Sequence, residues 1–279
     1  MELIIRLKRR FFQFIVNLFH KLREDQLFFL SNWLTYRVML AFFPFLVFLM
    51  SLLAFLHLDI TVMSEGLHGI LPEDVYYMVT GFFNETATMR NHALLSTSIF
   101  FVIFNSINGF RAITRCINNA YDAEDRRNVG MQAVLSVVLM LIFVVAIIVM
   151  LVILIFGRQI WTILETLLEW EPGRLATILS AVISFIVVTF VIMLIYKLSC
   201  AIKLKLRNVL PGAIFTVVAW ILASILFGFF ISNFSNMSAV YGSIAGIFIL
   251  MLWLNLVSVI LLLGNEINAY LYKSKQALS

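Results

Sequence analysis

The sequence predicts an all-α, polytopic membrane protein with six transmembrane helices, and its composition is the first reason. Of its 279 residues, 62% are hydrophobic and only 13% are charged. Soluble domains contain about 45–50% apolar and about 25% charged residues. A soluble fold of this length could not cover so large an apolar core with so few polar side chains. Long apolar stretches and a one-sided distribution of Lys and Arg are the second and third reasons.

Six stretches are apolar and long enough to cross a hydrocarbon core of about 30 Å, which takes about 20 helical residues. They do not alternate apolar and polar residues, and helices satisfy their own backbone hydrogen bonds in lipid. The chain is therefore expected to form a single integral membrane domain, residues 1–279, with spans at 38–58, 93–110, 131–156, 175–196, 209–231 and 244–264.

The distribution of Lys and Arg predicts the orientation. Residues 1–37, 111–130, 197–208 and 265–279 together carry seventeen of these residues, whereas the alternate segments carry three. Because Lys and Arg stay on the cytoplasmic side, both termini are expected in the cytoplasm. This placement needs an even number of spans, which agrees with six. The net charge of +5 then reflects topology and a preference for anionic lipid headgroups at the cytoplasmic face, and it predicts no nucleic-acid partner.

Two further helices are expected outside the spans. Residues 3–22 place apolar side chains at helical spacing, interleaved with basic ones. This pattern is typical of an N-terminal amphipathic helix on the inner leaflet, although a plain positively charged anchor explains the same residues. In the first outer loop, 59–92, Pro72 begins a segment whose apolar residues also follow helical spacing. A short outer-loop helix is expected there.

Polar side chains at membrane depth are the first candidates for function. Pro44 removes a backbone hydrogen bond from the first span and is expected to kink it. The other candidates occupy common faces of the second and last spans: Asn105, Asn108, Asn255, Ser258, Asn265 and Glu266. Spans one, two and six could enclose a polar path or cavity through these residues. Alternatively, and more commonly for such residues, the amides and hydroxyls hydrogen-bond between helices and hold the bundle together.

Charged and titratable residues give weak signals for chemistry. Arg37 and Glu266 fall at cytoplasmic ends of the first and last spans, where they can pair with each other or extend separately to the interface. Cys116 and Cys200 lie on predicted cytoplasmic segments, where thiols stay reduced. The four histidines lack metal-ligand spacing, and no Gly-rich phosphate loop is present. We therefore expect no enzyme activity, no cofactor, no metal and no ATPase domain in this chain.

Short motifs in a fixed order cover almost the whole chain. They are Leu34–Tyr36, Phe42–Pro44, Arg111 and Arg115 followed by Asn118–Tyr121, Leu210–Ala213, Ser232–Asn236, Tyr241–Ser243 and Gly264–Ala269. Each motif is short, but the ordered set resembles the YihY/virulence factor BrkB family of bacterial inner-membrane proteins. These motifs add Tyr36, Arg111, Arg115 and Asn268 to the candidate polar path or substrate contacts.

The resemblance implies a multi-pass protein of the bacterial plasma membrane. The family is associated with serum resistance and virulence, and some members have been proposed to move lipids or other amphiphiles. We therefore expect a transporter or flippase-like protein for a lipid or other amphiphile, with membrane lipids as partners and a homo-oligomer left open. The alternative is a non-transporting envelope scaffold or binding protein. We reject the family's old ribonuclease label because the sequence has no His-rich metal set and no extramembrane domain able to hold RNA.

Reporter fusions test the predicted orientation. A reporter placed after Ala123 and one placed after Ser279 are both expected to be cytoplasmic, because they follow segments rich in Lys and Arg. One inserted near Ser235 is expected outside. The measurement is alkaline phosphatase activity against green fluorescence at each position. An external reporter after Ala123 would contradict the six-span arrangement, because it would remove the second span.

Overall fold

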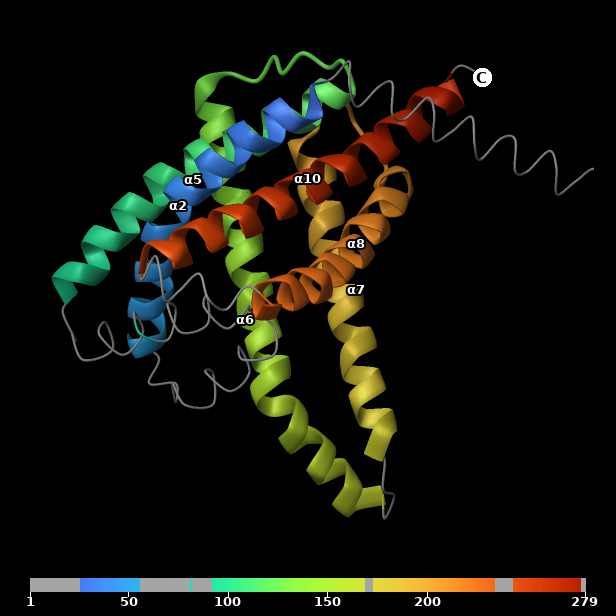
Figure 1. Cartoon of the computed structure of the whole chain (residues 1–279). Helices are drawn as coiled ribbons and strands as arrows, with labels where there is room; N and C mark the ends of the chain where they lie inside the picture. Colours follow the sequence, from blue (N-terminus) through green and yellow to red (C-terminus); the bar gives the residue numbers. More distant parts are fainter. Residues whose placement is uncertain (1–25, 56–80, 82–91, 169–172, 234–242, 277–279) are drawn as a thin grey trace, which may run out of the picture.

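All regular structure in the described part of the chain is helical. The computed structural model describes residues 26–55, 81, 92–168, 173–233 and 243–276. Six long helices make up the fold in Figure 1: α2 (Leu27–Phe55), α5 (His92–Ala120), α6 (Val129–Leu168), α7 (Gly173–Ser199), α8 (Leu206–Asn233) and α10 (Ser243–Gln276). The amphipathic helix predicted at 3–22 lies outside the described residues, and so does the outer-loop helix predicted after Pro72, apart from the helical Gly81.

Each predicted span coincides with one of these helices, which confirms an all-α polytopic membrane fold. Within the described residues, four segments are long and apolar enough to cross a membrane: Val129–Met150, Ile178–Ser199, Leu206–Ile231 and Gly246–Gln276. The apolar segment of α2, Leu27–Phe42, is shorter. Most of the predicted second span, 93–110, has side chains outside the described set. The count of six spans therefore stays a prediction.

The helices are longer than the spans that hydropathy predicts. α2 begins at Leu27 rather than at residue 38, and α10 continues to Gln276 rather than ending at residue 264. Charged residues end an apolar stretch, but Lys and Arg are good helix formers and do not end a helix. α6 has 40 residues, so it is about 60 Å long. At the usual tilt of about 20° it must extend beyond the hydrocarbon core.

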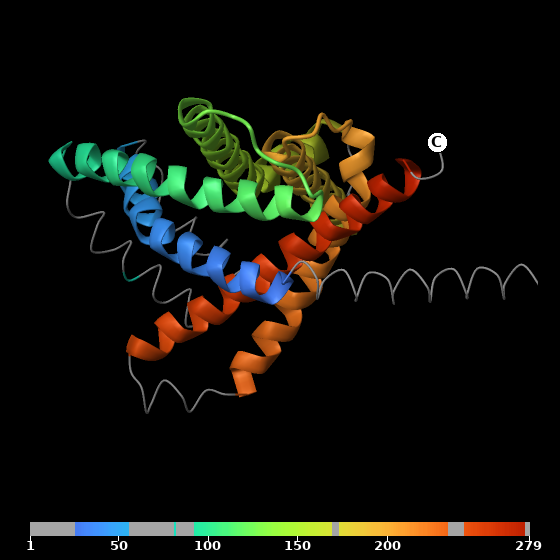
Figure 2. The same cartoon turned by 90° about the horizontal axis from the view of Figure 1, so that it is seen from above.

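The six helices pack in a closed ring. Consecutive helices contact each other from α2 through α5, α6, α7 and α8 to α10, and α10 returns to α2. α5 also contacts α7 and α10. Figure 1 shows α6 and α7 as a long hairpin that projects away from the other helices, and Figure 2 shows α2 lying between α5 and α10. α2 is bent along its length in Figure 1, as expected from Pro44 inside it.

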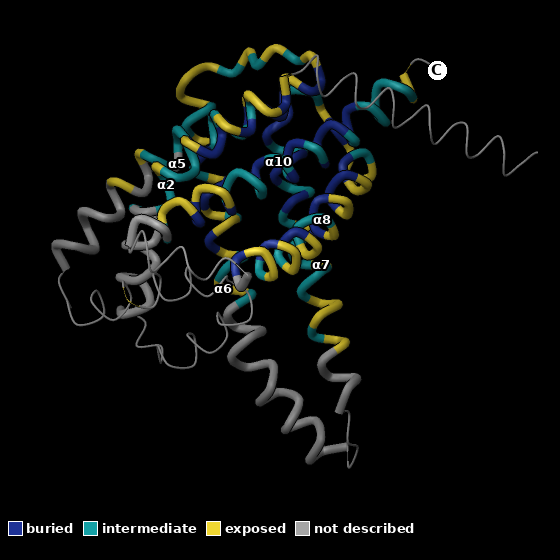
Figure 3. Tube along the Cα trace, in the orientation of Figure 1, coloured by how far each residue is buried: buried dark blue, intermediate teal, exposed yellow. Residues whose placement is uncertain are grey.

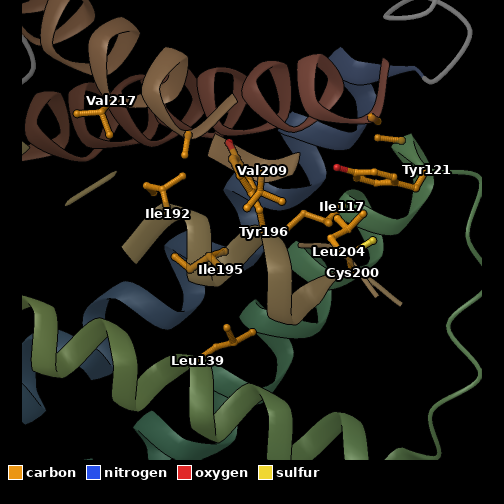
Figure 4. Packing of buried hydrophobic residues seen from close by; sticks show 13 residues of the cluster. Ile117, Tyr121, Leu139, Ile192, Ile195, Tyr196, Cys200, Leu204, Val209 and Val217 are labelled. Atoms are coloured by element: carbon orange, nitrogen blue, oxygen red, sulfur yellow. The ribbon is translucent and has the colours of Figure 1, made fainter. Parts of the chain in front are cut away.

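The buried core lies where the end of α5 meets α7, α8 and α10. Figure 3 shows buried positions gathered there, while exposed positions follow the outer faces of the helices. Figure 4 draws the cluster, which consists of Ile117, Ala120, Tyr121, Leu139, Ile192, Ile195, Tyr196, Cys200, Leu204, Val209, Ala213, Val217 and Ala269. Large apolar side chains such as Ile186 on α7 and Leu226 on α8 are exposed. In a membrane protein these outer faces contact acyl chains.

Two glycines bring the backbones of α8 and α10 into contact. A Cβ atom on Gly264 would lie 2.7 Å from the carbonyl oxygen of Gly212 and 2.7 Å from the hydroxyl of Tyr196. Only glycine fits there. Across the contact, Asn268 Oδ1 accepts the backbone N–H of Gly212 at 2.7 Å, and Asn268 Nδ2 donates to the carbonyl of Val209 at 3.1 Å. Close approach and hydrogen bonds thus fix the pairing of these two helices.

Tyr196 joins α7 to this contact. Its hydroxyl donates to the carbonyl of Leu261 on α10 at 2.6 Å and lies 2.7 Å from Thr216 Oγ1 on α8. Thr216 Oγ1 also lies 2.8 Å from the carbonyl of Gly212. Each hydroxyl has one proton, so Tyr196 donates to Leu261 and Thr216 shares its proton between Tyr196 and Gly212. A single buried network therefore ties together three helices.

Replacement of Gly264 by Ala is expected to destabilise the protein. The added Cβ forces α8 and α10 apart, and overpacking of this kind costs about 1–3 kcal/mol. Gly228→Ala on α8 is the matched control, because a Cβ there meets nothing within 4 Å, and Ala favours a helix over Gly by about 1 kcal/mol. Thermal unfolding of both variants in detergent should lower Tm for the first and not for the second. Equal Tm values would contradict the close contact.

Both cysteines are expected to resist modification in the folded protein. Cys116 and Cys200 are free thiols, each 2% exposed. Burial raises the pKa of Cys116 to about 12 and also raises the pKa of Cys200. Because the thiolate is the reactive form, little reaction with a maleimide is expected at pH 8. Lys203→Cys, at an exposed position, is the positive control. Rapid labelling of the wild-type chain before unfolding would contradict this packing.

Candidate functional site

A cavity of about 540 Å³ lies between α2, α5 and the beginning of α6. Its lining residues are mostly polar or charged: Trp33, Arg37, Asn108, Arg111, Ala112, Thr114, Arg115, Asn118, Asn119, Ala123, Asp125, Gln132 and Leu135. They come from the parts of these helices that the charge distribution predicts to be near the cytoplasm. The volume falls within the range of about 300–1,000 Å³ that is usual for small-ligand sites.

One face of α5 supplies much of the polar wall. Asn108, Arg111, Arg115 and Asn118 follow one another at intervals of three or four residues. Residues at this spacing lie on the same side of a helix. The opposite side of α5 packs into the core, where Cys116 and Ile117 are buried. The amphipathic pattern of α5 thus places a basic stripe on the cavity.

Two of the arginines come from different helices and converge on one indole ring. The guanidinium carbon of Arg37 on α2 lies 5.7 Å from the ring centroid of Trp33, and that of Arg115 on α5 lies 5.8 Å from it. Cation–π contacts contribute roughly 0.5–2 kcal/mol each. They hold a guanidinium group in place but leave its charge intact. The cavity wall therefore carries two fixed positive charges beside the same aromatic ring.

Arg111 supplies the third positive charge and is not fully satisfied by the protein. Its Nη2 donates to the carbonyl of Val129 at 3.2 Å, but its buried Nε has no acceptor within the described residues. Such a buried donor costs about 1–3 kcal/mol when it lacks an acceptor. The one carboxylate on the wall, Asp125, is 3.7 Å from Arg127 Nε and accepts the Arg127 backbone N–H at 3.1 Å. The acid is thus engaged with Arg127 rather than with the cavity arginines.

The loop after α5 begins with a tight turn below the cavity. Asp122 has a φ of 52°, which lies in the left-handed region. Its backbone N–H donates to Asn119 at 3.0 Å, and that of Ala123 donates to Asn118 at 3.0 Å. This pair of bonds is a Schellman motif, which ends a helix and satisfies its last carbonyls. The Asp122 side chain also forms an ion pair with Lys273 near the end of α10.

The same loop fixes the ends of two other helices. Arg127 Nη1 donates to the carbonyl of Leu198 at 3.2 Å, and its Nη2 donates to that of Cys200 at 2.7 Å. A cation at a helix C-terminus satisfies free carbonyls and is favoured by the helix dipole. Asn128 Oδ1 accepts the backbone N–H of Met131 at 2.8 Å and caps the start of α6. Three helix ends therefore position the cavity wall.

Four of the residues predicted from the sequence line the cavity, namely Arg37, Asn108, Arg111 and Arg115. Tyr36 is 57% exposed and not part of the wall. Asn105 donates to the carbonyl of Phe101 within its own helix at 2.9 Å. Ser258 is buried on α10. Pro44, within α2, is not part of the wall either.

Three predicted asparagines bond between helices instead. Asn255 Nδ2 donates to Asn32 Oδ1 at 2.7 Å and lies 3.3 Å from Thr35 Oγ1, both on α2. Asn265 Nδ2 donates to the carbonyl of Ile117 on α5 at 3.2 Å. Asn268 bonds to α8 as described above. At these three positions the hydrogen bonds agree with the alternative that polar side chains hold the helix bundle together.

The ion pair considered between Arg37 and Glu266 does not form. Arg37 lies over Trp33 on its own helix, and no ion pair joins it to Glu266 in the described part of the chain. Glu266 is 4% exposed on α10. The reason is the orientation of α2, which turns Arg37 toward α5 and the cavity. Sequence reasoning also missed Trp33, whose position four residues before Arg37 could have indicated a cation–π pair.

Comparisons with known proteins agree with this architecture. The sequence profile of the family described as Virulence factor BrkB matches residues 18–279. The ribonuclease-like protein YfkH of Bacillus subtilis is 34% identical over 246 residues, which cover 87% of this chain and 89% of that protein. A UPF0761 membrane protein of Tolumonas auensis is 36% identical over 80 residues, which cover 29% of this chain and 26% of that protein.

A second UPF0761 membrane protein, from Delftia acidovorans, aligns over more of the chain. It is 22% identical over 255 residues, which cover 90% of this chain and 60% of that protein. No solved structure matches the chain. The profile match over nearly the full length and the long alignment with YfkH agree with the motifs found in the sequence. The chain is therefore a multi-pass bacterial membrane protein that belongs to the virulence factor BrkB family.

Proposed function

We propose that this protein is a transporter or flippase-like protein whose cavity receives the polar end of a lipid or other amphiphile. The observation that supports the proposal is the basic cavity among membrane helices, with Arg37, Arg111 and Arg115 on its wall. Charged groups are costly near lipid and are usually retained for function or for pairing. No ion pair within the described residues engages these three arginines.

The surroundings of the cavity suit an amphiphile better than a fully soluble ligand. The helices that form the wall also expose apolar side chains, among them Leu40 on α2, Phe104 on α5 and Val138 on α6. A ligand can therefore place its headgroup against the arginines while its acyl chains stay against apolar faces. The proposal includes binding and movement of the ligand and no enzymatic step.

One observation favours a non-transporting envelope protein as the second candidate. Asn255, Asn265 and Asn268 all lie on α10, and they bond between helices rather than line the cavity. A protein that only holds a lipid or a membrane partner needs a site at one end of the bundle and a rigid interior. Such a scaffold would bind the same headgroups but would not move them.

Lipid movement in proteoliposomes tests the proposal. Liposomes with the full chain and an acyl-labelled fluorescent phosphatidylglycerol are treated with dithionite, which bleaches only the outer leaflet. We expect protein-dependent loss of the protected signal, because the cavity gives the headgroup a polar environment inside the bilayer. Arg115→Gln should slow this loss roughly tenfold, since a hydrogen bond to a charged group contributes about 1.5 kcal/mol or more.

Arg126→Gln is the matched control, because Arg126 is 86% exposed and not part of the wall. It removes the same charge and should leave the rate unchanged. Wild-type rates equal to those of protein-free liposomes, together with lipid that co-purifies with the chain, would favour the scaffold. Release of fragments from a labelled RNA by the wild-type protein, lost in Arg115→Gln, would instead contradict the non-enzymatic proposal.

A further inference from the structure

The geometry points to a phosphate monoester as the group that the cavity recognises. This inference rests on the proposed function, and it names the chemistry of the ligand's polar end. Two sources can supply such a group: a lipid whose headgroup is a terminal phosphate, or inorganic phosphate in solution. The chemistry follows from the charge of the wall, from the number of free donors and from the arrangement of the arginines.

The charge of the wall favours an anion with more than one negative charge. Arg37, Arg111 and Arg115 contribute three positive charges. Asp125 is the one carboxylate on the wall, and its contacts are with Arg127, which carries a compensating charge. A phosphodiester or a carboxylate would supply only one negative charge. A phosphate monoester carries about −1.5 to −2 at pH 7 and matches the wall more closely.

Free hydrogen-bond donors are also plentiful. A guanidinium has five N–H donors, yet within the described residues no hydrogen bond engages Arg37 or Arg115, and Arg111 gives one to Val129. Arg111 Nε is buried and lacks an acceptor. A guanidinium group can donate two parallel hydrogen bonds, as a fork, to two oxygens of one phosphate, which a Lys ammonium group cannot do. Three forks on one wall suit the three terminal oxygens of a monoester, whereas a diester offers two.

The arrangement of the arginines is fixed before any ligand binds. Arg111 and Arg115 are one helical turn apart on α5, and Arg37 reaches the same cavity from α2. Trp33 holds the guanidinium groups of Arg37 and Arg115 at 5.7 and 5.8 Å from one ring. Like charges on one cavity wall repel each other, and an anion in the cavity relieves the repulsion. A preorganised site of this kind loses little entropy when it binds.

Binding to the purified full chain tests the inference. The delipidated protein in detergent is titrated with dioctanoyl phosphatidic acid, which is a monoester, and with dioctanoyl phosphatidylglycerol and phosphatidylcholine, using native mass spectrometry. We expect one phosphatidic acid per chain, bound roughly tenfold more tightly than phosphatidylglycerol, because charge-assisted bidentate bonds are lost in the diester. Inorganic phosphate is expected to displace phosphatidic acid, but only at higher concentration, because it lacks the acyl chains.

Two variants and one control connect binding to the wall. Arg111→Lys keeps the charge but removes the fork, so it should weaken phosphatidic acid binding roughly tenfold. Arg115→Gln should remove the preference for the monoester. Arg126→Gln should bind like the wild type, because Arg126 lies on the exposed loop beside Glu124. Circular dichroism and Tm values equal to those of the wild type establish that each variant is folded, and Arg37→Lys replaces any variant that is not.

Each outcome has a defined meaning. Equal affinity for phosphatidic acid and phosphatidylglycerol overturns the inference, and so does a loss in Arg126→Gln as large as that in Arg115→Gln. Selective, arginine-dependent binding by a chain that moves no lipid in proteoliposomes supports the inference and overturns the proposed transport. Inorganic phosphate that binds as tightly as phosphatidic acid supports phosphate recognition, with the soluble ion as its source, and overturns the lipid proposal.

Discussion

The contact between α8 and α10 is the constraint on which the rest of the structure depends. Gly212 and Gly264 allow the two backbones to touch, and Asn268 locks the register with two hydrogen bonds. Once that register is set, α10 presents Leu261 to Tyr196 and brings α7 into place. It also presents Asn265 to the end of α5. The position of α5, and with it the basic wall of the cavity, follows from a contact made on other helices.

Polar residues of this protein divide into two sets by the environment in which they lie. Buried amides such as Asn118, Asn265 and Asn268 bond to backbone groups of neighbouring helices. An unsatisfied polar group costs several kcal/mol in an apolar interior, so these residues serve specificity of packing. Among the described residues, the arginines of the cavity form no ion pair: Arg37 and Arg115 lie over Trp33, and Arg111 donates to the carbonyl of Val129. Their charge is therefore not neutralised by an acid within the described residues.

The sequence predicted the helices well because lipid leaves few alternatives to a helix. Four cavity residues were among its candidates: Arg37 for its charge at the end of an apolar span, Asn108 for its place at membrane depth, and Arg111 and Arg115 for the motifs that contain them. The predicted spans were shorter than the helices, which extend to Leu27 and Gln276, because hydropathy detects polar and charged residues but not backbone bonding. The sequence left open whether Arg37 pairs with Glu266, and the Gly212–Gly264 contact went unnoticed. Both depend on how helices rotate and pair, which the spacing along one chain does not encode.

The ion pair between Asp122 and Lys273 is a weak contact between the α5–α6 loop and the end of α10. Asp122 is 69% exposed and Lys273 32%, and pairs of this kind contribute only about 0–1 kcal/mol and are screened by salt. By contrast, Asn118 holds α5 to the end of α7 through buried bonds to Ser199 and Ala201. Lys273 Nζ also donates to the carbonyl of Ala120 at 3.0 Å, and the ring of Tyr272 lies 5.9 Å from that of Tyr121, so two further contacts join the last turns of α10 to the end of α5. Salt is therefore expected to weaken the exposed ion pair and to leave the ring contact that joins α10 to α5 in place.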